Sequence, residues 1–534
     1  MKHLRLSRHF CVVALTLLAT FVHAQTYTEL HNFDWHKEGA NPLYPALLAQ
    51  GQDGSLYGTL QTQLSGVGSV FNSTLSGAVT QLYGFTGNDG EFPQSGLSLG
   101  FDGNFYGTTE EGGALRKGTV FKITPGGSMS VLHEFTDGAD GAYPWAAPIQ
   151  APDGNIYGVT DNGTNQGRIY RITSSGTFSV IAIAPAETQA PLILGTDGNL
   201  YGTTPYGGTF NQGTVFQLTT KGKLKIIHNF GADGLHPFGP VVQAADGKLY
   251  GTTPWGGTNG LGTVYVMTMA GGGYKVLHNF TTLDGVNPSS GMVQGSDKFL
   301  YSVATSGGAN GVGSLFKINT SGTTFSVLYN FNKTAGGFTP TGTPTLHTNG
   351  TIYGATNTGG SQFPAYGVLY SFTNKLKPFA SLVVIWSGKV GTQVGILGQG
   401  FSSATGVKFG SGAGTFTAVS DTYMIATVAA GATTGNVTVL EPGGNLVTPQ
   451  VFKVIPSISG FSPTSGTVGT SVVITGMSLA QTTAVTFGGV KAASFTVNSD
   501  TQVTAVVPTG GKTGTIKITT KGGSATSAAK FTVN

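Results

Sequence analysis

The chain has 534 residues, of which 85 are glycine, and only 9% are charged. This length exceeds one ordinary domain, so several separate cores are expected. Apolar residues make up 39% of the chain, which excludes the charge-rich composition of disordered proteins. Because glycine returns at fixed positions of a repeat, we interpret it as turns rather than as a flexible tract.

The first 24 residues have the pattern of a signal peptide. Three basic residues precede an apolar run at 10–21, and Ala24 offers the cleavage position. Without those three, 24 Lys and Arg face 23 Asp and Glu, so charge gives no reason to expect a nucleic-acid partner. The only cysteine, Cys11, lies in this leader, which leaves the mature chain without a disulfide or a thiolate metal site. We expect a protein that is secreted or held at the cell surface by binding, with no transmembrane segment in the mature chain.

One phrase returns seven times after the leader. An acidic or amide residue, Gly, a spacer and an apolar residue lead into Tyr-Gly, as in residues 53–58. The period of about 50 residues is typical of β-propeller blades. The tyrosines of the phrase are Tyr57, Tyr106, Tyr157, Tyr201, Tyr250, Tyr301 and Tyr353.

The residue pattern of each repeat predicts four short strands, separated by tight turns at sequences such as Asp-Gly. The chain opens with an unpaired fourth strand at 27–33, whereas the seventh repeat lacks one. We therefore expect the N-terminal strand to complete the last blade of a seven-bladed β-propeller over residues 26–376. In the fifth repeat the expected strands are 240–244, 249–253, 263–268 and 274–280.

Beyond residue 378 the repeat stops and the composition shifts toward Val, Thr, Ser, Ala and Gly. Two modules follow, at 380–454 and 455–534, with short alternating strands and no cysteine pair. This pattern fits immunoglobulin-like β-sandwiches. The expected fold class is all-β throughout.

The repeat phrase, followed by Gly-Thr-Val-Phe and Leu-His-Asn-Phe, resembles the Gloeo-Verruco tandem repeat of secreted bacterial proteins over residues 27–375. The second module resembles IPT/TIG domains through Phe-Ser-Pro-Thr-Ser-Gly at 461–466 and Val-Thr-Phe-Gly-Gly at 485–489, and the first module echoes it. The resemblance implies an exported surface or matrix protein. It supplies no catalytic residues.

No motif predicts catalysis or a cofactor. Gly-Leu-Ser-Leu-Gly at 96–100 is followed at once by a hairpin turn, so it lacks the helix of a nucleophile elbow. Gly-Gly-Lys-Thr at 510–513 lacks the leading glycine and the helix of a phosphate-binding loop. Recurring histidines fall on the outermost strands of different blades, too far apart to share one metal ion, so we expect them to pack. They are His31, His133, His228 and His278.

Acidic residues leave an enzyme open as the alternative. Glycosidases need two carboxylates that converge across one bond. A polysaccharide hydrolase or lyase is therefore the rival hypothesis, and a purely structural matrix protein is the third. The candidate acids for the rival are Glu110, Glu111, Asp140 and Asp161.

The longer loops of the repeats predict where a ligand would bind. Loops between blades, and between second and third strands, open on one face of a propeller, and functional residues concentrate on such loops. Aromatic rings there suit the apolar face of a sugar, while amides bond its hydroxyls. We expect a monomeric, non-enzymatic protein that binds a glycan, a cell-surface polymer or an extracellular protein, with the sandwiches as spacers or docking units; the alternative is that the rings only cap the core. The candidate residues are Trp35, Tyr44, Gln94, Tyr143, Trp145, Tyr206, His236, Phe238 and Trp255.

Overall fold

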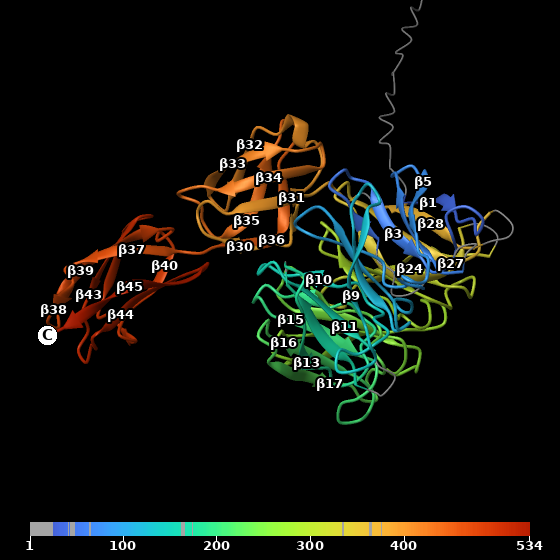
Figure 1. Ribbon diagram of the computed structural model, residues 1–534, viewed down its shortest axis with the longest axis horizontal. Coiled ribbons are helices and arrows are strands. Elements are labelled where there is room, and N and C mark those ends of the chain that lie inside the picture. The colour runs from blue at the N-terminus through green and yellow to red at the C-terminus, as the bar shows by residue number, and fades with distance from the viewer. Residues whose placement is uncertain are drawn as a thin grey trace, which may run out of the picture.

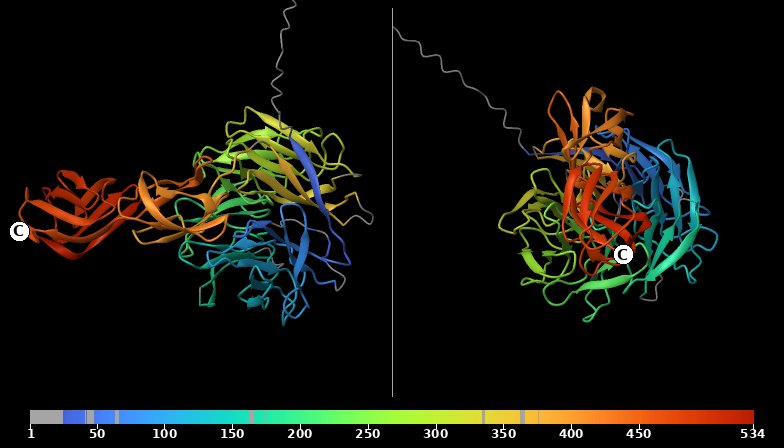
Figure 2. Two further views of the ribbon diagram at one scale, coloured as in Figure 1. Left: turned by 90° about the horizontal axis from the view of Figure 1, so that it is seen from above. Right: turned by 90° about the vertical axis from the view of Figure 1, so that its left-hand side faces the viewer.

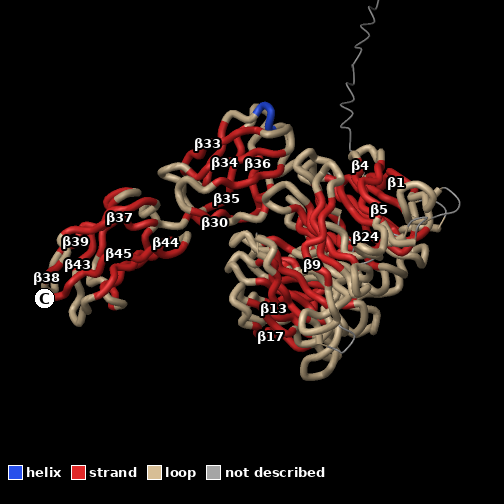
Figure 3. Tube along the Cα trace, in the orientation of Figure 1, coloured by secondary structure: helices blue, strands red, loops and turns tan. Residues whose placement is uncertain are grey.

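A computed structural model describes most of the chain after residue 24. The predicted signal peptide and Tyr44 lie outside the described residues. Within them the protein is all-β, and the one helical element is the 3-10 turn η1 (Phe401–Ser403) (Figure 3). The described residues are 25–40, 42, 48–62, 66–161, 166–173, 175–333, 336–361, 366–374 and 376–534.

Four-stranded antiparallel sheets follow one another along the first 330 residues, each built from four consecutive strands. The first three sheets are β2 (Ala49–Gln50), β3 (Leu56–Leu60), β4 (Ser69–Ser73), β5 (Val79–Gly84); β6 (Ser98–Leu99), β7 (Phe105–Thr109), β8 (Thr119–Ile123), β9 (Met129–Glu134); and β10 (Ile149–Gln150), β11 (Ile156–Thr160), β12 (Arg168–Ile172), β13 (Phe178–Ile183). The next three are β14 (Ile193–Leu194), β15 (Leu200–Thr204), β16 (Thr214–Leu218), β17 (Leu224–Asn229); β18 (Val242–Gln243), β19 (Leu249–Thr253), β20 (Thr263–Met267), β21 (Lys275–Asn279); and β22 (Val293–Gln294), β23 (Leu300–Ala304), β24 (Ser314–Ile318), β25 (Phe325–Asn330).

A further sheet joins the two ends of the repeat region. It consists of β26 (Phe338–Leu346), β27 (Thr351–Thr358), β28 (Val368–Thr373) and β1 (Thr26–Asn32). Strand β1 pairs antiparallel with β28, as the missing fourth strand of the last repeat led us to expect. The sheets follow one another around a circle in a propeller-like arrangement (Figure 2, right).

Neighbouring sheets pack against each other through the second and third strands. All five residues of β15 are buried, as are those of β7 and β19. Within a sheet, the glycine of Tyr-Gly makes room for an aromatic ring of the third strand; the sixth repeat has Ser302 at this position. A Cβ on Gly202 would collide with the ring of Phe216, its partner on β16. The aromatic residue of Gly-Thr-Val-Phe thus fills the space that the glycine leaves.

In six of the repeats the Asp and Tyr form a hydrogen bond that closes the first hairpin, whereas in the seventh Asn349 donates to the Tyr353 hydroxyl at 3.3 Å. Asp197 accepts from the Tyr201 hydroxyl at 2.8 Å and from the Asn199 backbone N–H at 3.0 Å. The tyrosine hydroxyl therefore has the partner that a buried phenol needs. The other pairs are Tyr57–Asp53, Tyr106–Asp102, Tyr157–Asp153, Tyr250–Asp246 and Tyr301–Asp297.

The histidines of the fourth strands stack on the next sheet. His133 lies 3.6 Å from the ring centre of Phe178, and His278 lies 3.8 Å from that of Phe325. His228 stacks in the same way on Tyr274, at 4.0 Å. Burial lowers the pKa of all three imidazoles. These residues carry out the packing role that the sequence predicts for them.

Two modules of equal topology follow the repeats. The first consists of β29 (Ser381–Val383), β30 (Ser387–Gly388), β31 (Gln393–Leu397), β32 (Gly406–Phe409), β33 (Gly412–Ala418), β34 (Tyr423–Val428), β35 (Gly435–Leu440) and β36 (Leu446–Val454). The second consists of β37 (Ser457–Ser462), β38 (Ser465–Gly466), β39 (Ser471–Met477), β40 (Thr482–Phe487), β41 (Val490–Lys491), β42 (Phe495–Ser499), β43 (Gln502–Val506), β44 (Gly514–Thr520) and β45 (Gly523–Val533). The second has two sheets, whereas unbroken β33 links the strands of the first into one eight-stranded sheet.

The first module docks on the ring, and the second continues away from it. Thr348, in the turn after β26, donates to the Gly398 carbonyl at 3.0 Å and accepts from Gln399 at 2.8 Å. The hydroxyls of Ser420 and Thr422 donate to the Gln52 carbonyl. The two modules extend from the ring in a line (Figures 1 and 2, left).

Candidate ligand-binding face

The two faces of the ring differ, because the first module docks on one of them. It contacts the turns between first and second strands, through Gln52, Thr196 and Thr348. Because the strands are antiparallel, the loops between sheets and those between second and third strands end on the opposite face. That opposite face carries those of the predicted candidate residues that the structure describes.

Four of the candidates form a continuous aromatic cluster. The His236 ring lies 5.0 Å from Tyr206 and 5.5 Å from Trp255, both edge-to-face. The ring centres of Phe238 and Trp255 lie 5.8 Å apart, also edge-to-face. Tyr206 and Trp255 remain 39% and 40% exposed, which is unusual for rings of this size. The cluster therefore offers two open ring surfaces on a packed base.

The repeat sequence sets the position of each ring. Thr204 and Thr253, the last residues of Tyr-Gly-Thr-Thr, donate to the carbonyls of Tyr206 and Trp255. His236 has a φ of 55°, and its N–H donates to the Gln212 carbonyl at 2.8 Å. Its Nδ1 donates to the Pro205 carbonyl at 2.6 Å, which fixes the imidazole between the two exposed rings.

Glycine and proline of successive repeats hold these loops together. Pro237 follows His236 and packs on Gly213, where a Cβ would lie 2.6 Å from the proline Cδ. The same fit joins Pro144 to Gly118 in an earlier repeat, where Tyr143 takes a φ of 51°. A side chain at the glycine would push the loop out of place. The Gly of Gly-Thr-Val-Phe thus positions the aromatic loop of the following repeat.

A cavity of about 300 Å³ adjoins the cluster. Tyr206, Glu187 and Asn211 supply a ring, a carboxyl group and an amide to its wall. Burial, and then the charge of Asp161, raise the pKa of the Glu187 carboxyl. A ring beside polar groups that accept and donate hydrogen bonds is the composition of a small polar-ligand site. Sequence reasoning missed Glu187, because the loop before β14 departs from the repeat pattern, and Asn211, which lies in the loop between β15 and β16.

The remaining candidates do not join this cluster. Trp35 contacts Tyr366, with 6.0 Å between ring centres. Tyr143 accepts a hydrogen bond from Lys117, which also pairs with Asp137 at 2.7 Å. Gln94 is 6% exposed, and its amide donates to Glu110, so it faces the protein. Trp145 is half-buried, and Tyr44 lies outside the described residues.

Two of the four candidate acids, Glu111 and Asp161, act on a third, Glu110. Burial, and then Glu111 and Asp161, raise the pKa of Glu110 to about 7. Asp140 is engaged elsewhere, because its carboxylate accepts from His133 at 3.1 Å and from the Thr136 N–H at 3.0 Å. Among the described residues, no group of three or more His, Cys, Asp or Glu is placed to hold a metal ion. None of the helices that the structure describes is long and apolar enough to cross a membrane.

Comparison with known protein families finds matches over most of the chain. The profile of the Gloeobacter/Verrucomicrobia repeat matches residues 17–186 and 187–419. The profile of the IPT/TIG domain matches residues 456–533. No curated protein matches the chain.

Solved structures give only distant likenesses. TolB from Acinetobacter baumannii is 16% identical, with a TM-score of 0.33 over 50% of this chain, which spans 61% of the length of TolB. A fungal alcohol oxidase of the AA5 family, in complex with copper, is 13% identical, with a TM-score of 0.43 over 95% of this chain and 100% of its own. A surface glycan-binding protein from Prevotella bryantii is 17% identical, with a TM-score of 0.22 over 28% of this chain and 38% of its own. At such TM-scores these likenesses establish neither fold nor function here.

Proposed function

Because the chain belongs to the Gloeobacter/Verrucomicrobia repeat family and carries an IPT/TIG domain, we propose that it is an exported, non-enzymatic protein that binds a glycan. The repeats, over residues 26–376, form a seven-bladed propeller whose last blade is completed by β1. The modules at 380–454 and 455–534 are two IPT/TIG-like sandwiches that serve as spacer or docking units. The signal peptide is removed after Ala24, and the mature protein is a monomer.

The architecture of this proposal rests on strand pairing. The sheet order β1-β28-β27-β26 uses the N-terminal strand as the outermost strand of the last sheet. Ring closure of this kind joins the two ends of the repeat region and leaves only short sheet edges at the outer strands. The first module repeats the strand order of the matched IPT/TIG domain, including a parallel pair between its second and last strands, β30 and β36. This shared topology supports the same fold for both modules.

The observation that best supports this function is the pair of exposed rings, Tyr206 and Trp255, which both contact the His236 ring. Aromatic rings bury the apolar face of a sugar, while neighbouring polar groups bond its hydroxyls. Glu187 and Asn211, in the cavity beside Tyr206, supply such polar groups. A polymer lying across both rings would make contacts in two adjacent repeats.

The test is binding of the full chain to a panel of neutral bacterial and plant polysaccharides. We expect Tyr206→Ala with Trp255→Ala to weaken binding about 10-fold or more, a free-energy change of about 1.4 kcal/mol or more. Trp35→Ala, which removes an indole elsewhere in the repeats, is the matched control and should bind as the original chain does. Circular dichroism checks that every variant is folded. Undiminished binding by the double variant, or no binding to any polymer, would contradict the glycan site.

The rival function is a polysaccharide hydrolase or lyase. It is favoured by Glu110, whose pKa of about 7 suits a general acid, with Asp161 close enough to influence it. Release of reducing sugars or unsaturated products during the binding assay would support an enzyme. Glu110→Gln should then abolish product release without abolishing binding. If no product is released from any polymer that binds, the non-enzymatic function stands.

A further inference from the structure

The segment between β13 and β14 differs from the other segments that join one sheet to the next. Acidic residues of comparable segments are bonded within their own repeat: Asp140 accepts from His133 at 3.1 Å, and Asp284 accepts from His278 at 3.2 Å. The carboxyl group of Glu187 has no hydrogen bond or ion pair with any of the residues that the structure describes. It is therefore available to a ligand.

This carboxyl group is held beside the exposed ring of Tyr206. A Cβ on Gly207 would lie 2.9 Å from the Ala186 Cβ, so the loop between β15 and β16 packs directly on the segment that carries Glu187. The Ala186 carbonyl accepts from the Gly167 N–H at 3.2 Å, which fixes the segment against the start of β12. The ring and the carboxyl group consequently line one cavity of about 300 Å³.

The surroundings of Glu187 oppose its negative charge. Burial, and then the charge of Asp161 from the loop between β11 and β12, raise the pKa of the Glu187 carboxyl. None of the described residues that line the cavity is basic. A cation bound in the cavity would compensate the charge of the carboxylate, which no group of the cavity wall does.

The open ring of Tyr206 favours the same kind of ligand. The face of an aromatic ring attracts a cation that lies within about 6 Å of the ring centre. Hydrogen bonds from an ammonium group to a carboxylate are about twice as strong as those between neutral groups. A hydroxyl group in the same place would leave the charge of Glu187 uncompensated. The ring and the carboxylate together therefore favour an amine over a hydroxyl.

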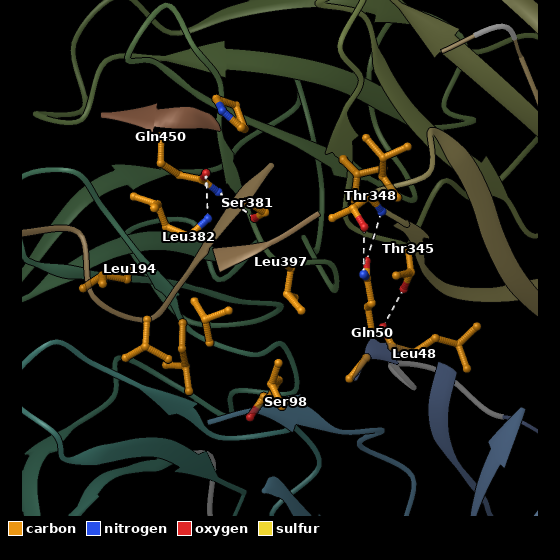
Figure 4. A pocket seen from close by; sticks show the side chains of 18 of the residues that line it. Leu48, Gln50, Ser98, Leu194, Thr345, Thr348, Ser381, Leu382, Leu397 and Gln450 are labelled. Atoms are coloured by element: carbon orange, nitrogen blue, oxygen red, sulfur yellow. Dashed lines mark hydrogen bonds between the residues drawn. The ribbon is translucent and has the colours of Figure 1, made fainter. Parts of the chain in front are cut away.

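The larger cavity, where the first module covers the ring, offers no comparable group. Its volume is about 500 Å³, and Figure 4 shows residues of both parts around it. Gln50 donates to the Thr348 hydroxyl at 2.8 Å, and Gln450 accepts from the Leu382 N–H at 3.4 Å. None of the described residues in its wall is charged. A charged ligand group thus has its partner beside Tyr206 rather than at this junction.

We propose that the cavity beside Tyr206 binds a sugar unit with a free amino group, for which Glu187 is the counter-ion. This proposal rests on the glycan binding proposed above and names the class of glycan, an amino-sugar polymer. The sugar ring lies on Tyr206, and its ammonium group donates to the Glu187 carboxylate. The Asn211 side-chain oxygen already accepts from the Gly207 N–H at 2.9 Å, so its amide nitrogen donates to a sugar hydroxyl. The polymer continues across Trp255.

The experiment compares three oligosaccharides of equal length and linkage, titrated into the full chain by calorimetry at low salt. The β-linked hexasaccharides of glucosamine, N-acetylglucosamine and glucose differ only in the amino, acetamido or hydroxyl group at one ring carbon. We expect the glucosamine hexasaccharide to bind about 10-fold more tightly than the other two. Glu187→Gln should remove this preference and leave binding of the glucose hexasaccharide unchanged.

Glu134→Gln changes the net charge of the chain by the same amount, at the exposed last residue of β9, and should keep the preference. Tyr206→Ala with Trp255→Ala should weaken binding of all three compounds. The amino-sugar proposal is overturned if the glucosamine hexasaccharide does not bind most tightly to the original chain, or if folded Glu187→Gln keeps the preference. Glycan binding itself then still stands, provided that the double variant binds more weakly than the original chain.

The comparison on the original chain needs no variant, so it decides even if Glu187→Gln does not fold. Absence of binding by all three hexasaccharides would also overturn the amino-sugar proposal. The polysaccharide panel described above then decides separately whether the protein binds any glycan.

Discussion

At the scale of single residues, Glu110 couples the candidate face to pH. Burial, and then Glu111 and Asp161, raise its pKa from an ordinary value of 4.5 to about 7. Below the lower value the carboxyl is neutral in the folded and unfolded states and has no effect on stability. Between the two values only the unfolded chain loses the proton, so the free energy of unfolding falls as pH rises. Above pH 7 the carboxyl is ionised in both states, and the free energy of unfolding falls no further on its account.

We therefore expect Glu110→Gln to raise the melting temperature at pH 8 and to change it little at pH 4.5. The substituted amide keeps an acceptor oxygen for Gln94, so the hydrogen bond between the two residues is retained. Thermal unfolding of the two proteins across this pH range measures the difference. Glu134→Gln, at the exposed last residue of β9, is the matched control and should show no such trend. A stabilisation that is equal at both pH values would contradict the raised pKa.

The sequence predicts residue roles where the repeat determines them. Spacing placed the aromatic residues on one face, and four of them, His236 included, form one cluster. Spacing did not predict the hydrogen bond from Gln94 to Glu110. These two residues are 16 positions apart, and the pair occurs in one repeat only. Glu187 was missed for the same reason, since its loop departs from the pattern of the others. Periodicity identifies what repeats share, whereas a binding site depends on where they differ.

At the scale of elements, the strand pairing follows from counting strands. The first repeat is preceded by an extra fourth strand, and the last repeat lacks one. This predicts that the N-terminal strand pairs with the last repeat, and β1 does pair with β28. Strand lengths were less well predicted: 240–244 was expected where β18 covers only Val242–Gln243. Near the channel the first strand of a sheet pairs with one neighbour only. In the first six sheets this strand ends after two residues while its apolar pattern continues, whereas β26 of the last sheet has nine residues.

The contact of β1 with the adjacent sheet gives a test of this closure. Tyr27 stacks on Tyr329 of β25 at 3.9 Å and also contacts Phe331. Removing the ring leaves a gap between the first strand and the sixth sheet, so Tyr27→Ala should lower the free energy of unfolding by about 3 kcal/mol. Urea denaturation measures the loss. Thr26→Ala, one residue away and exposed, should cost less than about 0.5 kcal/mol; similar effects of both changes would argue against a role for β1 in closure.

At the scale of the whole molecule, the two modules differ in how they meet their neighbours. The first is joined to the ring by hydrogen bonds at Thr348, Ser420 and Thr422, and by apolar contact of Leu99 with Val383 and Leu397. The second meets the first through Gln481, which accepts from the Thr434 N–H at 2.9 Å, and Asp500, which accepts from the Gly431 N–H at 3.2 Å. The first junction includes an apolar core, so ring and first module should behave as one body.

Thr348 is the residue on which to test that coupling. It is 2% exposed, and its hydroxyl donates to Gly398 and accepts from Gln50 and Gln399. Thr348→Val keeps the shape but leaves these groups unpaired, which should weaken docking by about 1–3 kcal/mol. Calorimetry should then resolve a separate, lower transition for the first module, and scattering should report a larger radius of gyration. Thr483→Val, on the exposed surface of the second module, should change neither. A single unshifted transition in Thr348→Val would mean that the apolar contact at Leu99 alone holds the module, and that the ring and the module are coupled without the hydrogen bonds.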